Sequence, residues 1–144
     1  MKIEITNQQK LKRIHLNRLS QRLKKVFKIL GLSSKKASFL LCDNSFIKKI
    51  NLKYFKKNIP TDVIAFSLKD EADPDYLGEI IVSVEQACIV CGRYALSFQE
   101  ELFLYLVHGI LHLLGYNDKT KKDKEKMHRK EKEILVKLGR IRND

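Results

Sequence analysis

The chain lacks any run of 18 apolar residues, which is about the length that a helix needs to cross a membrane. Its first residues, MKIEITNQQ, also lack the basic and apolar regions of a secretory signal. We therefore expect a cytoplasmic protein that makes no membrane contact. Cysteines are few, and the three present cannot all pair, so reduced thiols are expected at Cys42, Cys88 and Cys91.

The sequence also lacks internal repeats and any linker long enough to separate two domains. Its 144 residues are enough to bury a core without disulfides or other covalent support. A single domain over residues 1–144 is therefore predicted.

Acidic residues are scarce at both ends of the chain. Residues 1–60 carry sixteen lysines and arginines and two acids, residues 61–118 carry two and ten, and residues 119–144 carry eleven and five. The net charge of +12 therefore comes from two basic ends around an acidic middle. Basic ends favour a polyanionic partner, although a high net charge also serves solubility alone.

The spacing of the apolar residues predicts four strands and five helices. The strands are expected at 2–6, 37–42, 63–66 and 78–84, and the helices at 10–30, 46–54 after a cap cluster at 43–45, 85–94, 98–114 and 121–138. This order predicts an α/β (mixed α+β) fold, with one small four-stranded mixed sheet packed with about five helices. The helix at 98–114 follows a capping box at Ser97 and is apolar nearly all round, so we expect it at the centre of the domain.

Two of the four histidines, His108 and His112, lie four residues apart in this helix and therefore share one face. Gly115 can end the helix in a left-handed turn, and Asp118 follows three residues later. Imidazoles on a buried helix are costly unless they are bonded to something. We predict a metal site at His108, His112 and Asp118, with zinc as the metal and an open position for water. The metal-bound water would be the nucleophile, with no separate base assigned.

The spacing of the histidines also matches the H-E-x-x-H pattern of zinc peptidases, in which the glutamate is the general base. Gly109 occupies that position here and cannot transfer a proton, so a peptidase would need another base, such as Asp62 or Glu79. RNA is a better substrate for such a site, because its 2′-hydroxyl can supply the nucleophile. Attack by metal-activated water is the other route, and the spacing does not choose between them.

Four short runs of the sequence form a recognisable pattern, namely NLKY at 51–54, PTDVIAF at 60–66, LGEI at 77–80 and HGILHLLGYND at 108–118. Together they resemble the YbeY family of metal-dependent endoribonucleases. The run HGILHLLGYND at 108–118 is similar to that family's H-G-x-L-H-L-x-G-Y-D-H signature. Asn51-Leu-Lys-Tyr54 and the run PTDVIAF at 60–66 are similar to its N-x-x-Y-R and P-T-D-V-L-S-F blocks, and Leu77-Gly-Glu-Ile80 to its L-G-D-I strand start. The resemblance covers about residues 36–138, with order and spacing kept.

The resemblance implies a cytoplasmic bacterial endoribonuclease that is specific for single strands. It implies action in maturation of the 16S rRNA 3′ end and in ribosome quality control. One zinc ion per chain is implied, held at positions 108, 112 and 118. The implied partners are rRNA and the small ribosomal subunit, with ribosomal proteins or a ribosome-associated GTPase as further partners.

Two positions depart from the family pattern. Asp118 stands where the family has a histidine, and a carboxylate still ligates zinc at that spacing while also suiting a harder cation such as Mn²⁺. The alternatives are that the third ligand is lost or that His128 on the next helix replaces it. Phe55 stands where the family carries an arginine, and a phenyl ring cannot make a bidentate phosphate contact.

Phosphate contacts are therefore expected from basic residues near Phe55 and on the first helix, namely Lys53, Lys56, Lys57, Arg18 and Arg22. The two departures also motivate an alternative function, a catalytically weak or inactive factor that binds rRNA or the ribosome. A zinc peptidase is the third hypothesis.

Overall fold

One four-stranded mixed sheet organises the computed structural model, which describes residues 2–68, 70–91, 93 and 96–141. The strands lie in the order β1-β2-β4-β3. β1 (Lys2–Asn7), β2 (Lys36–Cys42) and β4 (Tyr76–Ser83) are parallel, and β3 (Val63–Ser67) pairs antiparallel with β4 at one edge. The prediction of a small mixed sheet in a single α/β domain is confirmed.

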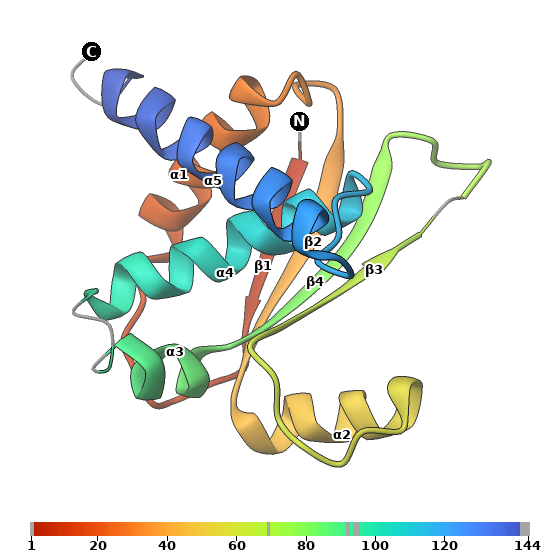
Figure 1. The fold of residues 1–144 in the computed structure, drawn as a ribbon, viewed down its shortest axis with the longest axis vertical. Helices are drawn as coiled ribbons and strands as arrows, with labels where there is room; N and C mark the ends of the chain where they lie inside the picture. The colour runs from red at the N-terminus through yellow and green to blue at the C-terminus, as the bar shows by residue number, and fades with distance from the viewer. Residues whose placement is uncertain (1, 69, 92, 94–95, 142–144) are drawn as a thin grey trace.

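In the part of the chain that the structure describes, five helices pack around this sheet, as predicted. They are α1 (Leu16–Ile29), α2 (Asn44–Phe55), α3 (Val84–Cys91), α4 (Phe98–Leu113) and α5 (Lys121–Ile141). Figure 1 shows α4 crossing the sheet with α1 and α5 beside it, while α2 lies apart from them. Within the described ranges, none of these helices is long and apolar enough to cross a membrane.

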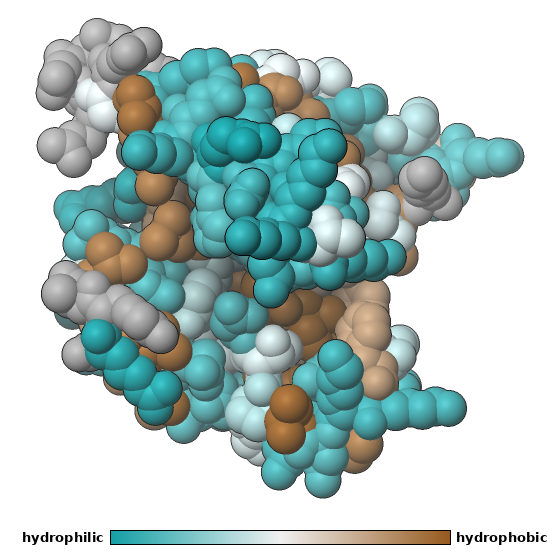
Figure 2. Space-filling model, viewed as in Figure 1, coloured by the Kyte–Doolittle hydropathy of each residue, from teal (hydrophilic) through white to brown (hydrophobic). Residues whose placement is uncertain are grey.

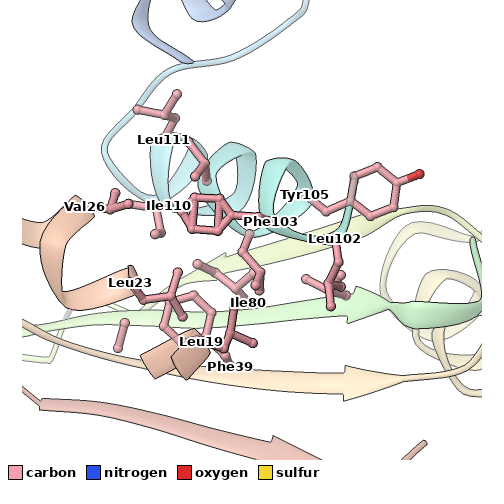
Figure 3. Packing of buried hydrophobic residues seen from close by; sticks show 14 of the residues in the cluster. Leu19, Leu23, Val26, Phe39, Ile80, Leu102, Phe103, Tyr105, Ile110 and Leu111 are labelled. Atoms are coloured by element: carbon pink, nitrogen blue, oxygen red, sulfur yellow. The ribbon is translucent and has the colours of Figure 1, made fainter. Parts of the chain in front are cut away.

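The core lies on both faces of the sheet, because alternate residues of each strand point in opposite directions. Phe39 of β2 and Ile80 of β4 belong to the larger cluster, which they form with apolar side chains of α1, α4 and α5. Figure 3 shows side chains of α1 and α4 meeting these strand residues. On the other face, Ile64 and Ile81 pack with Ile47 of α2. The site-bearing helix α4 is therefore central, as its apolar sequence predicted.

The first helix begins at Leu16, so the prediction of a start at residue 10 was wrong. The buried side-chain amide of Gln9 organises the preceding segment as a loop. Its Nε2 donates to Oδ1 of Asn7 and to the Lys12 carbonyl, while its Oε1 accepts from the backbone N–H groups of Leu11 and Lys12. These bonds satisfy backbone groups outside a helix and leave Leu11 exposed.

The other helix boundaries agree more closely. α3 ends at Cys91, and the predicted end at Tyr94 lies outside the described residues. α5 continues to Ile141, beyond its predicted end at residue 138.

Candidate metal centre

Gly109 lets α4 lie directly on the sheet beside the two histidines. A Cβ at this position would lie 2.6 Å from Cγ2 of Ile80 and 3.2 Å from Cγ2 of Val63, closer than ordinary van der Waals contact. A glutamate in the H-E-x-x-H position would need the helix to move away from β3 and β4. The packing therefore opposes a peptidase of that type.

The turn after α4 carries the third candidate ligand back toward the histidines. The N–H of Gly115 donates to the His112 carbonyl over 3.0 Å, and the N–H of Tyr116 donates to the Leu111 carbonyl over 3.0 Å. This pair of bonds is the Schellman arrangement, and Gly115 adopts the positive φ of 98° that it requires. The glycine turn predicted at this position is confirmed, and Asp118 follows it.

His108, His112 and Asp118 come together at the end of α4. One potential ligand atom from each lies within 4.8 Å of the others. The two Nε2 atoms are 3.0 Å apart, close to the roughly 3.3 Å between two nitrogens on a tetrahedral zinc ion. Two imidazoles and a carboxylate are zinc-type donors, so these three residues fit the predicted metal.

His128, the alternative third ligand, lies elsewhere. Its side chain is 74% exposed, and its Nδ1 is 3.7 Å from Oε2 of Glu131 rather than in the three-residue cluster. Asp118 is therefore the third candidate ligand that the structure favours, and the identity of the ligand set stays a prediction.

Glu131 of α5 is hydrogen-bonded to the ring nitrogen of His108 that points away from His112. Its Oε1 accepts a hydrogen bond of 2.8 Å from Nδ1 of His108, and its side chain is only 14% exposed. Burial opposes a positive charge on His108, but the bond to Glu131 and the nearby carboxylates outweigh burial and raise the pKa of His108. In the ring orientation that this bond fixes, Nε2 of His108 faces His112.

The pKa of His112 is shifted in the opposite direction from that of His108. Burial, together with repulsion from His108, lowers the pKa of His112, which favours its neutral form. A hydrogen bond with the Tyr116 backbone opposes this shift without reversing it. A neutral imidazole has the lone pair that a metal ion requires.

A cleft of about 450 Å³, here called the α2–α4 cleft, opens beside these ligands. The side chains that line it include Asn51, Phe55, Lys57, Asp62, His108, His112 and Asp118. Figure 2 shows this face hollowed between α2 and the start of α5, with hydrophobic surface inside the hollow.

Asn51 joins α2 to the loop on one side of the cleft. Its side-chain Nδ2 donates to the Ile59 carbonyl over 3.0 Å, and its backbone carbonyl accepts from the N–H of Lys57. Asp62 ends this loop, where its Oδ1 accepts from the N–H of Val63 over 2.7 Å. The loop therefore presents Lys57 and Asp62 to the cleft that is also lined by the two histidines.

Glu79, the other base considered for a peptidase, lies on β4 and does not line this cleft.

The predicted phosphate-binding residues divide into two groups. Lys57 lines the α2–α4 cleft, while Lys53 and Lys56 are exposed beside it at the end of α2. Arg18 and Arg22 are on α1 and line a different cavity, where the Arg22 guanidinium lies 3.8 Å from the centre of the Phe103 ring. Of the five predicted phosphate-binding residues, the structure thus brings Lys57 into the lining of the cleft, and it places the two arginines elsewhere.

Sequence reasoning missed Glu131, although a signal for it exists. Met127, Ile134 and Leu138 form the buried stripe of α5. Glu131 lies four residues after Met127 and three before Ile134, which places a carboxylate on the apolar face of the helix. A charged residue in that position is a candidate partner for a buried cation or histidine.

Comparisons with known proteins identify the family of this chain. The family model described as Endoribonuclease YbeY matches residues 4–139. An Endoribonuclease YbeY of Syntrophus aciditrophicus is 36% identical over 144 residues, covering 96% of this chain and 90% of the relative. Another, of Carboxydothermus hydrogenoformans, is 39% identical over 102 residues, covering 71% of each chain.

A solved structure is also similar. The solution structure of TM1509 from Thermotoga maritima superposes with a TM-score of 0.69 at 26% sequence identity. The match covers 98% of this chain and 92% of that protein. The same fold therefore extends over nearly the whole sequence.

Proposed function

The chain belongs to the YbeY family of endoribonucleases, and we propose that its α2–α4 cleft cleaves phosphodiester bonds of single-stranded RNA in a metal-dependent reaction. One observation carries the proposal. His108, His112 and Asp118 meet in a cleft that is also lined by Lys57, so metal-type donors and a positively charged side chain line the same space.

Zinc is the metal that we propose for this site, with Mn²⁺ as a second candidate because Asp118 offers a harder ligand. When bound, the ion would supply a Lewis acid and a water of lowered pKa. His108, His112 and Asp118 would hold it. Glu131 would keep the His108 ring in the ligating orientation.

The remaining groups of the cleft have separable tasks. Lys57, with Lys53 and Lys56 nearby, would neutralise the phosphates that flank the scissile bond. Asp62 is a carboxylate of the cleft outside the ligand set, held by the N–H of Val63. We assign it the task of accepting the proton of the attacking group, which is either the 2′-hydroxyl of the RNA or a water, as its oxygen bonds to phosphorus and the bond to the leaving oxygen breaks.

The proposed cellular substrate is rRNA, with maturation of the 16S 3′ end and ribosome quality control as the processes. The family and the two basic ends of the chain support this assignment. The proposed partner is the small ribosomal subunit in the cytoplasm, together with ribosomal proteins or a ribosome-associated GTPase.

The test combines metal content with cleavage of a labelled precursor rRNA in the presence and absence of a chelator. We expect about one metal ion per chain, and loss of both metal and cleavage in His112→Ala and Asp118→Ala. His128→Ala is the matched control, because that histidine is exposed and outside the cluster, and it should retain both properties. Full metal content and full activity in Asp118→Ala would refute the assignment of the third ligand.

A second candidate function is an RNA-binding factor without turnover. The presence of Phe55 in the cleft favours it, because this side chain offers no charge to a phosphate. Such a factor would bind RNA in a salt-dependent manner and leave the labelled precursor intact with every metal tested. The same cleavage assay therefore separates the two functions.

A further inference from the structure

The last turn of α2 exposes two aromatic rings beside the metal ligands. Tyr54 is 55% exposed and Phe55 is 48% exposed, although large apolar side chains usually gain from burial. Phe55 also lines the α2–α4 cleft with His108 and His112. An exposed aromatic ring that faces a candidate catalytic cleft is a potential contact for substrate.

Both rings contact a third aromatic ring, that of Phe66 on β3. The rings of Phe55 and Phe66 are stacked, with an interplanar angle of 12° and 6.0 Å between centres. Tyr54 meets Phe66 edge to face, at 64° and 5.1 Å. Phe66 is part of the half-buried shell around Ile64 and Ile81, so the sheet supports the stack. Phe55 is therefore the outer member of a supported stack and is about half open to solvent.

The charges around the stack favour a nucleotide over an apolar partner. Lys57 lines the same cleft, Lys56 follows Phe55 directly, and the Lys53 ammonium lies 5.3 Å from the centre of the Tyr54 ring. An apolar partner would have to remove these three charges from water, which is unfavourable. A nucleotide offers a π-face to the ring and a phosphate to the lysines. Proteins that bind single strands use this combination of aromatic rings and basic grooves.

We propose that Phe55, supported by Phe66, is a stacking platform for one unpaired base of the RNA strand that enters the α2–α4 cleft. This inference rests on the proposed function for the identity of the strand as RNA. It assigns Phe55 a substrate-positioning role in which the ring face takes the place of a phosphate contact. Bases within a duplex are stacked on both sides, so the platform selects single strands.

The binding test uses a single-stranded 2′-O-methyl oligonucleotide, about ten nucleotides long, with 2-aminopurine placed at successive positions. The modified ribose cannot supply its 2′-hydroxyl as a nucleophile, and gel analysis verifies that the probe stays intact. Binding is read by anisotropy, and stacking by quenching of 2-aminopurine. In the wild-type protein we expect quenching at one position in the strand.

Phe55→Leu keeps an apolar side chain and removes the ring. We expect affinity to fall on the order of 5- to 150-fold and the quenching to disappear. Phe55→Tyr should retain both signals. Leu52→Ala, at a position that is 48% exposed on the same helix but does not line the cleft, should bind like the wild type. Lys57→Ala should weaken binding and its salt dependence while leaving the quenching in place.

Equal affinity and equal quenching in the wild type and Phe55→Leu would overturn the platform, even if the protein cleaves RNA. If the wild type cleaves no RNA but shows Phe55-dependent quenching, the platform stands and the proposed catalytic function fails. An equal loss in Leu52→Ala and Phe55→Leu would also overturn the platform, because it would point to a general apolar contact.

Discussion

Glu131 and His108 are joined by a 2.8 Å hydrogen bond that links α5 to α4 across 23 residues of sequence. A carboxylate behind a metal-binding imidazole fixes the ring and raises its basicity. We expect Glu131→Gln to weaken metal affinity by about 10- to 100-fold, measured by competition with a chromophoric chelator.

The control for Glu131 is Glu133→Gln on the same helix. Glu133 is 45% exposed and pairs with Lys137 on the surface, so its replacement should leave metal affinity unchanged. Equal losses in the two variants would show that the effect comes from general charge rather than from support of His108.

Gly109→Ala tests the close contact between α4 and the sheet. The added Cβ would lie 2.6 Å from Ile80, so we expect the free energy of unfolding to fall by about 1–3 kcal/mol in urea denaturation. Gly139 of α5 has nothing within 4 Å of such an atom. Gly139→Ala should instead raise the free energy of unfolding by about 0.5–1 kcal/mol, because alanine favours helix. Two variants of equal stability would contradict the proposed packing.

Cys42 should make stability depend on pH in the alkaline range. Its Sγ donates to the Val82 carbonyl over 3.4 Å, and burial raises the pKa of the Cys42 thiol to about 12. The unfolded chain would lose this proton near the ordinary value of 9.0, so above that pH it binds fewer protons than the folded chain. The stabilisation is therefore complete below pH 9.0 and is lost as pH rises toward 12.

The measurement is the free energy of unfolding at about pH 8 and about pH 10 in the wild type and in Cys42→Val. The decrease with pH should be smaller in the variant, which has no thiol to ionise. A decrease of the same size in both proteins would assign the alkaline effect to other groups, such as Tyr105, whose pKa is also raised by burial.

Asp118→His tests the metal preference of the cluster. An imidazole is softer than a carboxylate, so we expect zinc affinity to rise relative to Mn²⁺ affinity. Competition between the two metals, followed by elemental analysis of the isolated protein, measures the ratio. Asp123→His, in the first turn of α5 and outside the cluster, is the control. An unchanged ratio in Asp118→His would mean that residue 118 is not a ligand.

Elements with strong local signals were predictable from the sequence. The start of α4 is determined by a capping box in which Ser97 Oγ accepts from the N–H of Glu100, and its end by the turn at Gly115. Asp43 likewise caps α2 by accepting from the N–H of Phe46. Because these interactions involve residues close in sequence, the pattern of side chains was enough to locate them.

The errors arose where contacts distant in sequence, or a buried polar side chain, decide the structure. Apolar spacing alone suggested a helix from residue 10, but the bonds of the Gln9 amide produce a loop there. Arg18 and Arg22 have the charge of phosphate-binding residues, yet α1 directs them to a cavity outside the candidate site. The partnership of Glu131 with His108 depends on how α5 crosses α4, which the local sequence does not reveal.

The donors of the candidate centre come from one short segment, His108 to Asp118. Its helix and turn are already held by backbone hydrogen bonds and by apolar packing around Ile110 and Leu111. We therefore expect the fold to form without a metal ion, in contrast to a zinc finger, whose fold requires its ion. Under the proposed metal-dependent function, a chelator should therefore abolish RNA cleavage without lowering the free energy of unfolding by more than the binding of the ion contributes.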